Sequence, residues 1–396
     1  MNAELATESH IRKKPYLEKN LLIIFCITLT AILSVSTLAP AFPKIREEFA
    51  ISDQSVGLLI TFFTLPGVVL TPVLGVLADR YGRKRILVPS LMLFGIAGGM
   101  CAFITNFELL LTLRFVQGIG GAALGSLNVT VIGDLFSGKE RTSAMGYNAS
   151  VLSVGTAAYP ALGGALADLS WNYPFLLAFI GIPVGLLVLF VLNNPEPKNR
   201  QNLKEYLHNL WISLKHCRVI VLFAASCVTF IILYGSYLTY FPLLLDERFE
   251  VSSFVIGLVM SSMSAVTAVT ASQLGRLASI FSEQTLLKAS FIIYGVSLAI
   301  FPFVHTFWLL VIPIVIYGVA QGINIPSIIT LLSGMAPMEY RAAFMSANGM
   351  VLRIGQTLGP MLMGFMVILG GISYAFFTGT ALAVIMFVVL IIILRK

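Results

Sequence analysis

Charge is scarce in this chain. Only 11% of its 396 residues are charged and 58% are hydrophobic, and the mean hydropathy is +0.92. This composition excludes a water-soluble domain of this length and indicates a protein that lies in a lipid bilayer. The net charge of +7 comes from short basic clusters between apolar runs, so it indicates membrane topology rather than nucleic-acid binding.

Acidic residues and histidines are missing from the middle of the apolar segments. All 18 acidic residues and all four histidines lie in loops or near segment ends, so no carboxylate or imidazole is predicted at mid-membrane depth. The four cysteines have neither paired nor metal-like spacing. With no nucleophile motif or phosphate loop, we predict no enzyme, no metal and no cofactor.

Twelve segments are long and apolar enough to cross a bilayer. They cover approximately 21–41, 54–77, 86–105, 109–132, 142–167, 173–193, 219–242, 253–274, 286–304, 307–332, 343–367 and 372–394. Of the 25 Lys and Arg residues, 20 fall on the side of the membrane that holds the N-terminus. The positive-inside rule therefore predicts that both termini are cytoplasmic.

The chain also repeats itself. Nine identities at an offset of 200 residues link the fifth and eleventh segments, including Asn148 with Asn348, Pro160 with Pro360 and Gly164 with Gly364. The repeat divides the chain into a cytoplasmic segment 1–20, a six-helix unit 21–193, a cytoplasmic linker 194–218 and a second six-helix unit 219–396.

The loop after the second segment reads Gly-Val-Leu-Ala-Asp-Arg-Tyr-Gly-Arg-Lys-Arg-Ile-Leu over 75–87. It resembles the loop signature of the major facilitator superfamily of secondary transporters. The resemblance implies an all-α membrane protein with twelve transmembrane helices in two pseudo-symmetric bundles, similar to the twelve-span drug–proton antiporters of bacterial cytoplasmic membranes. A second, degenerate copy of this motif at 275–287 has Ser279 where the first has Asp79.

In this family the loop serves as a gate. We expect Gly75 to allow close helix packing and Asp79 to pair with an arginine, Arg141 being a plausible partner. The plainer alternative is a basic membrane anchor with a glycine turn. The predicted gating residues are Gly75, Asp79, Arg80, Gly82, Arg83 and Arg141.

Two further segments carry motifs. Arg114, in an R-x-x-Q-G pattern with Gln117 and Gly118, resembles the family's proton-coupling arginine; the alternative is an arginine that reaches toward the nearby outer surface. The fifth segment resembles the antiporter signature but has Tyr159 where glycine is usual. Its predicted motif residues are Gly146, Gly155, Pro160, Gly163 and Gly164.

Arg353 lies near the middle of the eleventh segment, where a guanidinium requires acceptors or water. It is the leading candidate for a substrate or coupling contact, although a bond to its own helix backbone is an alternative. The remaining predicted cavity residues, from the inner helices of this family, are Gln356, Ser34, Thr37, Asn128, Tyr234, Tyr237, Gln321 and Asn324.

Two functions fit these patterns. The first is proton-coupled efflux of a small organic molecule, such as a drug, siderophore or metabolite, by alternating access. The second is uptake of an organic anion or another small nutrient, which the two arginines and the missing acid favour. In either case we expect the partners to be a small-molecule substrate, protons and the bilayer, with no nucleic acid, and the protein to be a monomer.

Overall fold

The structure is a computed structural model that describes residues 18–193, 217–335 and 341–394. Twelve helical spans in this part of the chain are long and apolar enough to cross a membrane, from Lys19–Glu48 to Ile372–Ile393. The prediction of an all-helical membrane protein is confirmed. The predicted segment 1–20 and linker 194–218 lie almost entirely outside the described residues.

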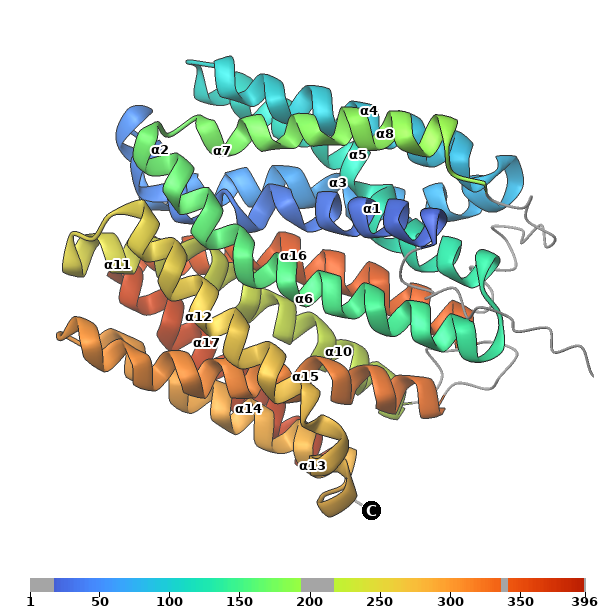
Figure 1. The fold of residues 1–396 in the computed structure, drawn as a ribbon. Coiled ribbons are helices and arrows are strands. Elements are labelled where there is room, and N and C mark those ends of the chain that lie inside the picture. The colour runs from blue at the N-terminus through green and yellow to red at the C-terminus, as the bar shows by residue number, and fades with distance from the viewer. Residues whose placement is uncertain (1–17, 194–216, 336–340, 395–396) are drawn as a thin grey trace, which may run out of the picture.

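The first half of the chain contains the helices that Figure 1 draws from blue to green. They are α1 (Lys19–Ser36), η2 (Ala39–Ala41), α2 (Phe42–Glu48), α3 (Asp53–Tyr81), α4 (Arg83–Met100), η3 (Cys101–Phe103), α5 (Phe107–Leu135), α6 (Gly138–Leu169), α7 (Tyr173–Leu176), η4 (Leu177–Ile180) and α8 (Gly181–Phe190).

The second half follows in yellow-green to red and lies below the first in that view, except where α6 overlaps α16. It contains α10 (Cys217–Ile231), the π-helix η5 (Ile232–Tyr240), α11 (Phe241–Phe249), α12 (Ser253–Ser272), α13 (Leu274–Ile280), α14 (Glu283–Ile300), η6 (Phe301–Phe303), η7 (Phe307–Leu310), α15 (Val311–Met335), α16 (Arg341–Gly370) and α17 (Ile372–Ile393).

Two helix pairs make most of the contacts between the halves, α6 with α12 and α3 with α16. The repeat explains this symmetry, because α6 and α16 are equivalent and so are α3 and α12. A Cβ at Gly57 in α3 would lie 3.3 Å from Cβ of Pro360, and a Cβ at Gly257 in α12 would meet the carbonyl of Pro160. Equivalent glycine and proline positions therefore form the same contact twice, about a pseudo-twofold axis.

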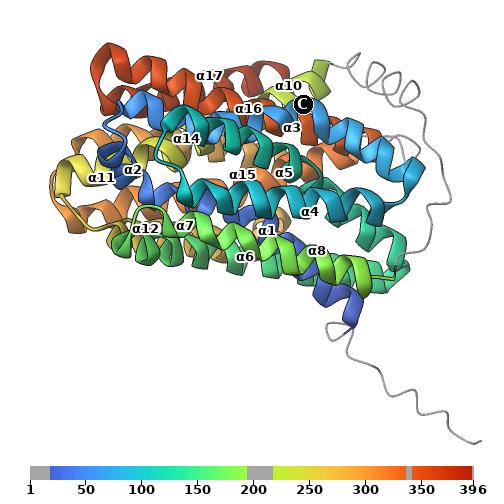
Figure 2. The ribbon, with the colours of Figure 1, turned by 90° about the horizontal axis from the view of Figure 1, so that it is seen from above.

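Among the described residues, the close contacts between the halves lie at one end of the bundle and extend to its middle, where Arg353 lies against Gly67. We call the end with α2 and α11 the closed end; these helices lie side by side at the left of Figures 1 and 2. At the other end, which we call the open end, Gly75, Gly146 and Gly275 have nothing within 4 Å of an added Cβ. Figure 1 shows α13 at this end, turned away from the first half.

Candidate functional site

Arg114 is fully enclosed within the first half. Its Nε donates to the carbonyl of Leu59 at 3.1 Å, and its Nη1 donates to Ser34 at 2.6 Å and to Gln117 at 2.7 Å. The guanidinium lies 4.6 Å from the ring centroid of Phe63. Only 1% of the residue is exposed, so Arg114 ties α1, α3 and α5 together rather than reaching toward the surface.

Arg353 lies between the two halves. Its Nη1 donates to Gln356 at 3.1 Å, and its Cδ lies 3.2 Å from the Cβ position of Gly67 in α3. Nη2 lies 3.7 Å from the Cβ position of Gly125 in α5, which is exposed. Tyr234 is close enough to interact electrostatically with this guanidinium. The described residues place no carboxylate within ion-pair distance of Arg353.

Most of the other predicted cavity residues are buried inside one half. Ser34 bonds to Arg114, and Thr37 bonds to the carbonyl of Leu33 in its own helix. Gln321 accepts from Tyr294. Each of these side chains bonds to its own helix or to a neighbour in the same half, and their place in a central cavity stays a prediction.

Asn128 and Asn324 form a related pair of contacts. Asn128 donates to Thr28, and Asn324 accepts from Thr229 at 2.7 Å. Each asparagine thus binds a threonine of the first helix in its own half, and it holds that helix in place instead of facing a cavity. The sequence signal for this contact is a threonine at nearly the same position in the two repeats.

Tyr234 and Tyr237 do not share a face as expected. Both lie in the π-helix η5, whose wider turn, closed by backbone bonds between residues five apart, changes the angle between side chains. Tyr237 donates to the carbonyl of Met260 at 3.0 Å and stacks on Tyr317. Tyr234 is half-buried near Arg353, so only it belongs to the interface.

At the open end, Asp79 forms an ion pair with Arg83, and Arg83 Nε donates to Asp134 of α5 at 3.0 Å. Arg141, the expected partner of Asp79, instead places its guanidinium 3.2 Å from the Cβ position of Gly133.

Gly75 makes no close helix contact here, contrary to expectation, whereas Gly82 has φ +100°, a turn that favours glycine. Arg80 lies over Tyr81.

The antiporter-like motif of α6 is divided along its length. Gly146 has open space around it, and Gly155 faces Ile32 and Leu29 of α1. A Cβ at Gly163 would meet the carbonyl of Thr37 in the same half, whereas a Cβ at Gly164 would meet the carbonyl of Ser253 in the other half. The closed-end part of the motif therefore contains the contact between halves.

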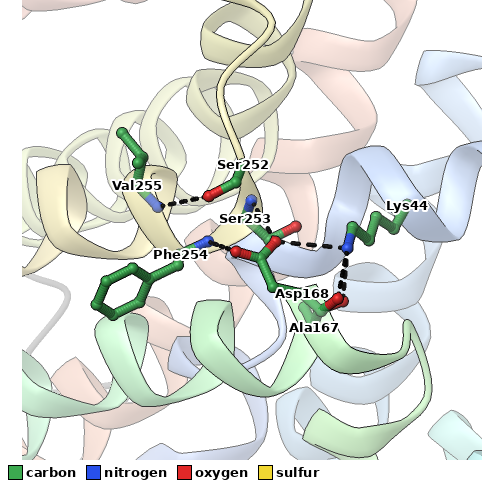
Figure 3. A network of polar contacts seen from close by, with 7 residues as sticks. All are labelled: Lys44, Ala167, Asp168, Ser252, Ser253, Phe254 and Val255. Atoms are coloured by element: carbon green, nitrogen blue, oxygen red, sulfur yellow. Dashed lines mark hydrogen bonds and ion pairs between the residues drawn. The ribbon is translucent and has the colours of Figure 1, made fainter.

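Sequence analysis missed a polar network at the closed end. Asp168 accepts from the backbone N–H of Ser253 at 2.9 Å and of Phe254 at 3.2 Å, at the N-terminus of α12 (Figure 3). Lys44 lies 3.4 Å from the same carboxylate. The network crosses from the first half to the second, and a carboxylate at a helix N-terminus is also favoured by the helix dipole.

A second bridge lies beside it. Arg46 donates to Asp53 at 2.8 Å and to Asp246 of α11 at 3.0 Å. Positions 46 and 246 are equivalent in the repeat and carry opposite charges. That offset was the signal that could have identified the bridge, since equivalent positions near a twofold axis face each other. Among the described residues, no group of three His, Cys, Asp or Glu side chains could hold a metal.

The family follows from a comparison with known sequences. The Major Facilitator Superfamily profile matches residues 24–254 and 241–396. The chain belongs to this superfamily. It is 26% identical to Multidrug resistance protein 1 of Bacillus subtilis (strain 168) over 92% of this chain and 94% of the relative. It is also 26% identical to the Bacillibactin exporter of the same organism (86% and 88% covered) and to the class B tetracycline resistance protein of Escherichia coli (86% of each).

Solved structures share the fold of this facilitator chain. A point mutant of the nucleoside transporter NupG superposes with a TM-score of 0.77 at 15% identity, over 95% of this chain and 100% of that one. A bacterial homologue of the human lysosomal transporter Spinster gives a TM-score of 0.76 at 18% identity, over 96% and 95%. The chain is thus a multi-pass membrane transporter resembling the drug–proton antiporters.

Proposed function

We propose that this chain exports a small organic molecule, such as a drug, siderophore or metabolite, from a bacterial cell in exchange for protons. The observation that carries the proposal is the pair of equivalent glycine–proline contacts, which hold two repeated halves together at one end while the other end stays apart. Such halves can rock about a central site and expose it to each side in turn. The names of the efflux relatives support the direction.

We further propose that the open end faces the cytoplasm. Arg80, Arg83, Lys84 and Arg276 lie there, as the positive-inside rule requires of cytoplasmic loops. Both termini and the linker 194–218 would then lie inside, the halves would span 21–193 and 219–396, and the membrane would be the bacterial cytoplasmic membrane. The two halves together contain one complete interface, so a monomer suffices.

Two polar networks act as alternating gates in this proposal. The bridges of Asp168 and Arg46 hold the outer end closed when the inner end is open. Asp79, Arg83 and Asp134 form the second network, which would act at the inner end when the outer end opens. Asp79→Asn would weaken the inner network and slow the transport cycle by about tenfold, because an ion pair whose arginine is buried contributes about 1–2 kcal/mol.

Arg114 is the proposed link to proton movement. No acid lies at mid-membrane depth among the described residues, and Arg114 holds Ser34 and Gln117 of the first half in fixed positions. Its role would be to orient these polar groups. Loss of coupling in Arg114→Ala, with substrate binding retained, is the expected result in proteoliposomes under an imposed pH gradient.

Inside-out membrane vesicles test the direction. A panel of anionic, neutral and cationic compounds is offered with and without a pH gradient, and a panel member should accumulate only when the vesicle interior is acidic. Vesicles without the protein are the control. Accumulation confined to right-side-out vesicles or intact cells would instead establish uptake, the second function considered from the sequence.

A further inference from the structure

Two arginines lie within membrane-spanning helices, Arg114 in α5 and Arg353 near the middle of α16, and their surroundings differ. Arg114 directs three hydrogen bonds to acceptors of its own half and stacks over Phe63. Arg353 directs one side-chain hydrogen bond, to Gln356, in the part of the chain that the structure describes. A guanidinium has five N–H donors in a planar fork, so most donors of Arg353 have no protein acceptor.

The position of Arg353 makes these donors available. The residue is half-buried, and Gly125 opposite its Nη2 is exposed, so the space beside the guanidinium is open. Gly67 and Gly125 have no side chain that would fill this space from the first half. A charge at this depth without an acceptor is costly, and the cost falls when an anion binds.

Aromatic rings lie beside the same space. Tyr234 interacts electrostatically with Arg353, and its ring stacks on Phe230 with centroids 6.0 Å apart. Both rings are half-buried. A fork of donors near a half-buried aromatic pair suits a planar molecule with an acidic group, because the ring can pack while the acid accepts two parallel hydrogen bonds.

We propose that Arg353 binds the anionic group of the transported molecule, so that the substrates are aromatic organic anions or zwitterions. The proposal rests on the proposed transport function and names its substrate class. Gln356 positions the guanidinium through Nη1, and Tyr234 packs against the ring of the substrate. Since Arg353 belongs to the second half and faces glycines of the first, the bound anion lies at the interface that opens and closes.

Equilibrium binding to the purified full-length protein in detergent tests this. The probes are salicylate and its neutral isostere salicylamide, with benzoate, nicotinate and phenylphosphonate as further anions. We expect at least one anion to bind, and salicylate to bind about tenfold or more tightly than salicylamide, because hydrogen bonds to charged groups are the stronger ones. Added salt should weaken anion binding.

Variants locate the site. Arg353→Gln should lower anion affinity about tenfold or more, to the level of the neutral isostere, whereas Arg353→Lys, which keeps the charge but loses the fork, should retain part of it. Arg276→Gln, on exposed α13, is the matched control and should bind normally. The isostere comparison needs only the wild-type protein, so a poorly folding variant does not prevent the test.

Two results would overturn the proposal: no panel anion binds at millimolar concentration, or Arg353→Gln binds salicylate as tightly as the wild type does. The vesicle experiment separates this failure from failure of the function. If neutral or cationic compounds are exported but no anion binds, the anion site is wrong and the exporter stands. If salicylate binds through Arg353 but no compound moves, the site stands and transport is wrong.

Discussion

Arg114 and Arg353 look alike in the sequence, since each is a lone arginine in an apolar segment with a glutamine three residues later. Their difference comes from distant residues. Ser34 and Leu59, which accept hydrogen bonds from Arg114, lie 80 and 55 positions away, and no local pattern reveals them. Sequence analysis could therefore identify both arginines as important but could not say which one makes more hydrogen bonds within its own half.

The first prediction concerns stability at Arg114. Arg114→Ala should lower the free energy of unfolding by about 2–4 kcal/mol, because it leaves Ser34, Gln117 and the carbonyl of Leu59 buried without a donor. Thermal unfolding in detergent measures this. Arg276→Ala, an exposed position, should change little. An unchanged melting temperature in Arg114→Ala would mean that these contacts do not stabilise the packing of α1, α3 and α5.

At the scale of the elements, neighbouring glycines of α6 should have separable effects. Gly163→Ala would drive a methyl group into the carbonyl of Thr37 in the same half, so it should lower the stability of the fold by about 1–3 kcal/mol. Gly164→Ala would press on Ser253 in the other half, so it should mainly open the closed end. Gly146→Ala, with open space around it, is the matched control.

Spin labels at Glu48 and Glu247, exposed near the ends of α2 and α11, report on the closed end. Gly164→Ala should add a longer distance between them, and Gly163→Ala should not. On the same samples, the melting temperature should fall more in Gly163→Ala than in Gly164→Ala. If the two variants gave the same label distances and the same melting temperatures, Gly163 would not stabilise the fold separately from the contact between halves that Gly164 makes.

The bridge at the N-terminus of α12 yields another prediction. Asp168→Asn removes the charge that faces two backbone N–H groups and Lys44. It should shift the equilibrium toward separation of the closed end by about fivefold to thirtyfold, because a charge-assisted bond is worth about 1–2 kcal/mol at such a site. The same label pair measures it, with Glu283→Gln as the control; an unchanged distribution would rule the bridge out as a gate.

The elements themselves were mostly predictable, since twelve apolar runs become twelve spans with ends displaced by a few residues. The predicted elements differ from the observed ones in two places, where a helix changes type or where a span continues into a polar helix. The first span continues through η2 into α2 as far as Glu48, and apolar length could not indicate this. The π-helix η5 separates Tyr234 from Tyr237, and the spacing of an α-helix gave no sign of it.

For the whole molecule, fixing the halves together should stop transport. Ala161 N–H donates to Ser261 across the interface at 3.1 Å, so cysteines at these two positions, in a variant lacking the native cysteines, should form a disulfide. Flux in proteoliposomes should fall at least about tenfold on oxidation, a loss above 1.4 kcal/mol in rate terms, and return on reduction.

The control pairs cysteines at Gly146 and Thr270, on the open-end stretches of the same two helices. These should not cross-link while the closed end is held by the native contacts. Undiminished flux through the oxidised Ala161–Ser261 variant would mean that the halves do not need to separate at this end, and alternating access about this interface would be wrong.

The unneutralised guanidinium of Arg353 also has an electrical consequence. When the site opens to one side, its positive charge comes to the potential of that side, and moving one elementary charge through 100 mV changes the free energy by about 2.3 kcal/mol. An occupied site that holds a monovalent anion carries no net charge, but an empty one does. Membrane voltage would then act on the return of the empty carrier and leave the loaded step almost untouched, so transient currents should arise without substrate and diminish when it binds.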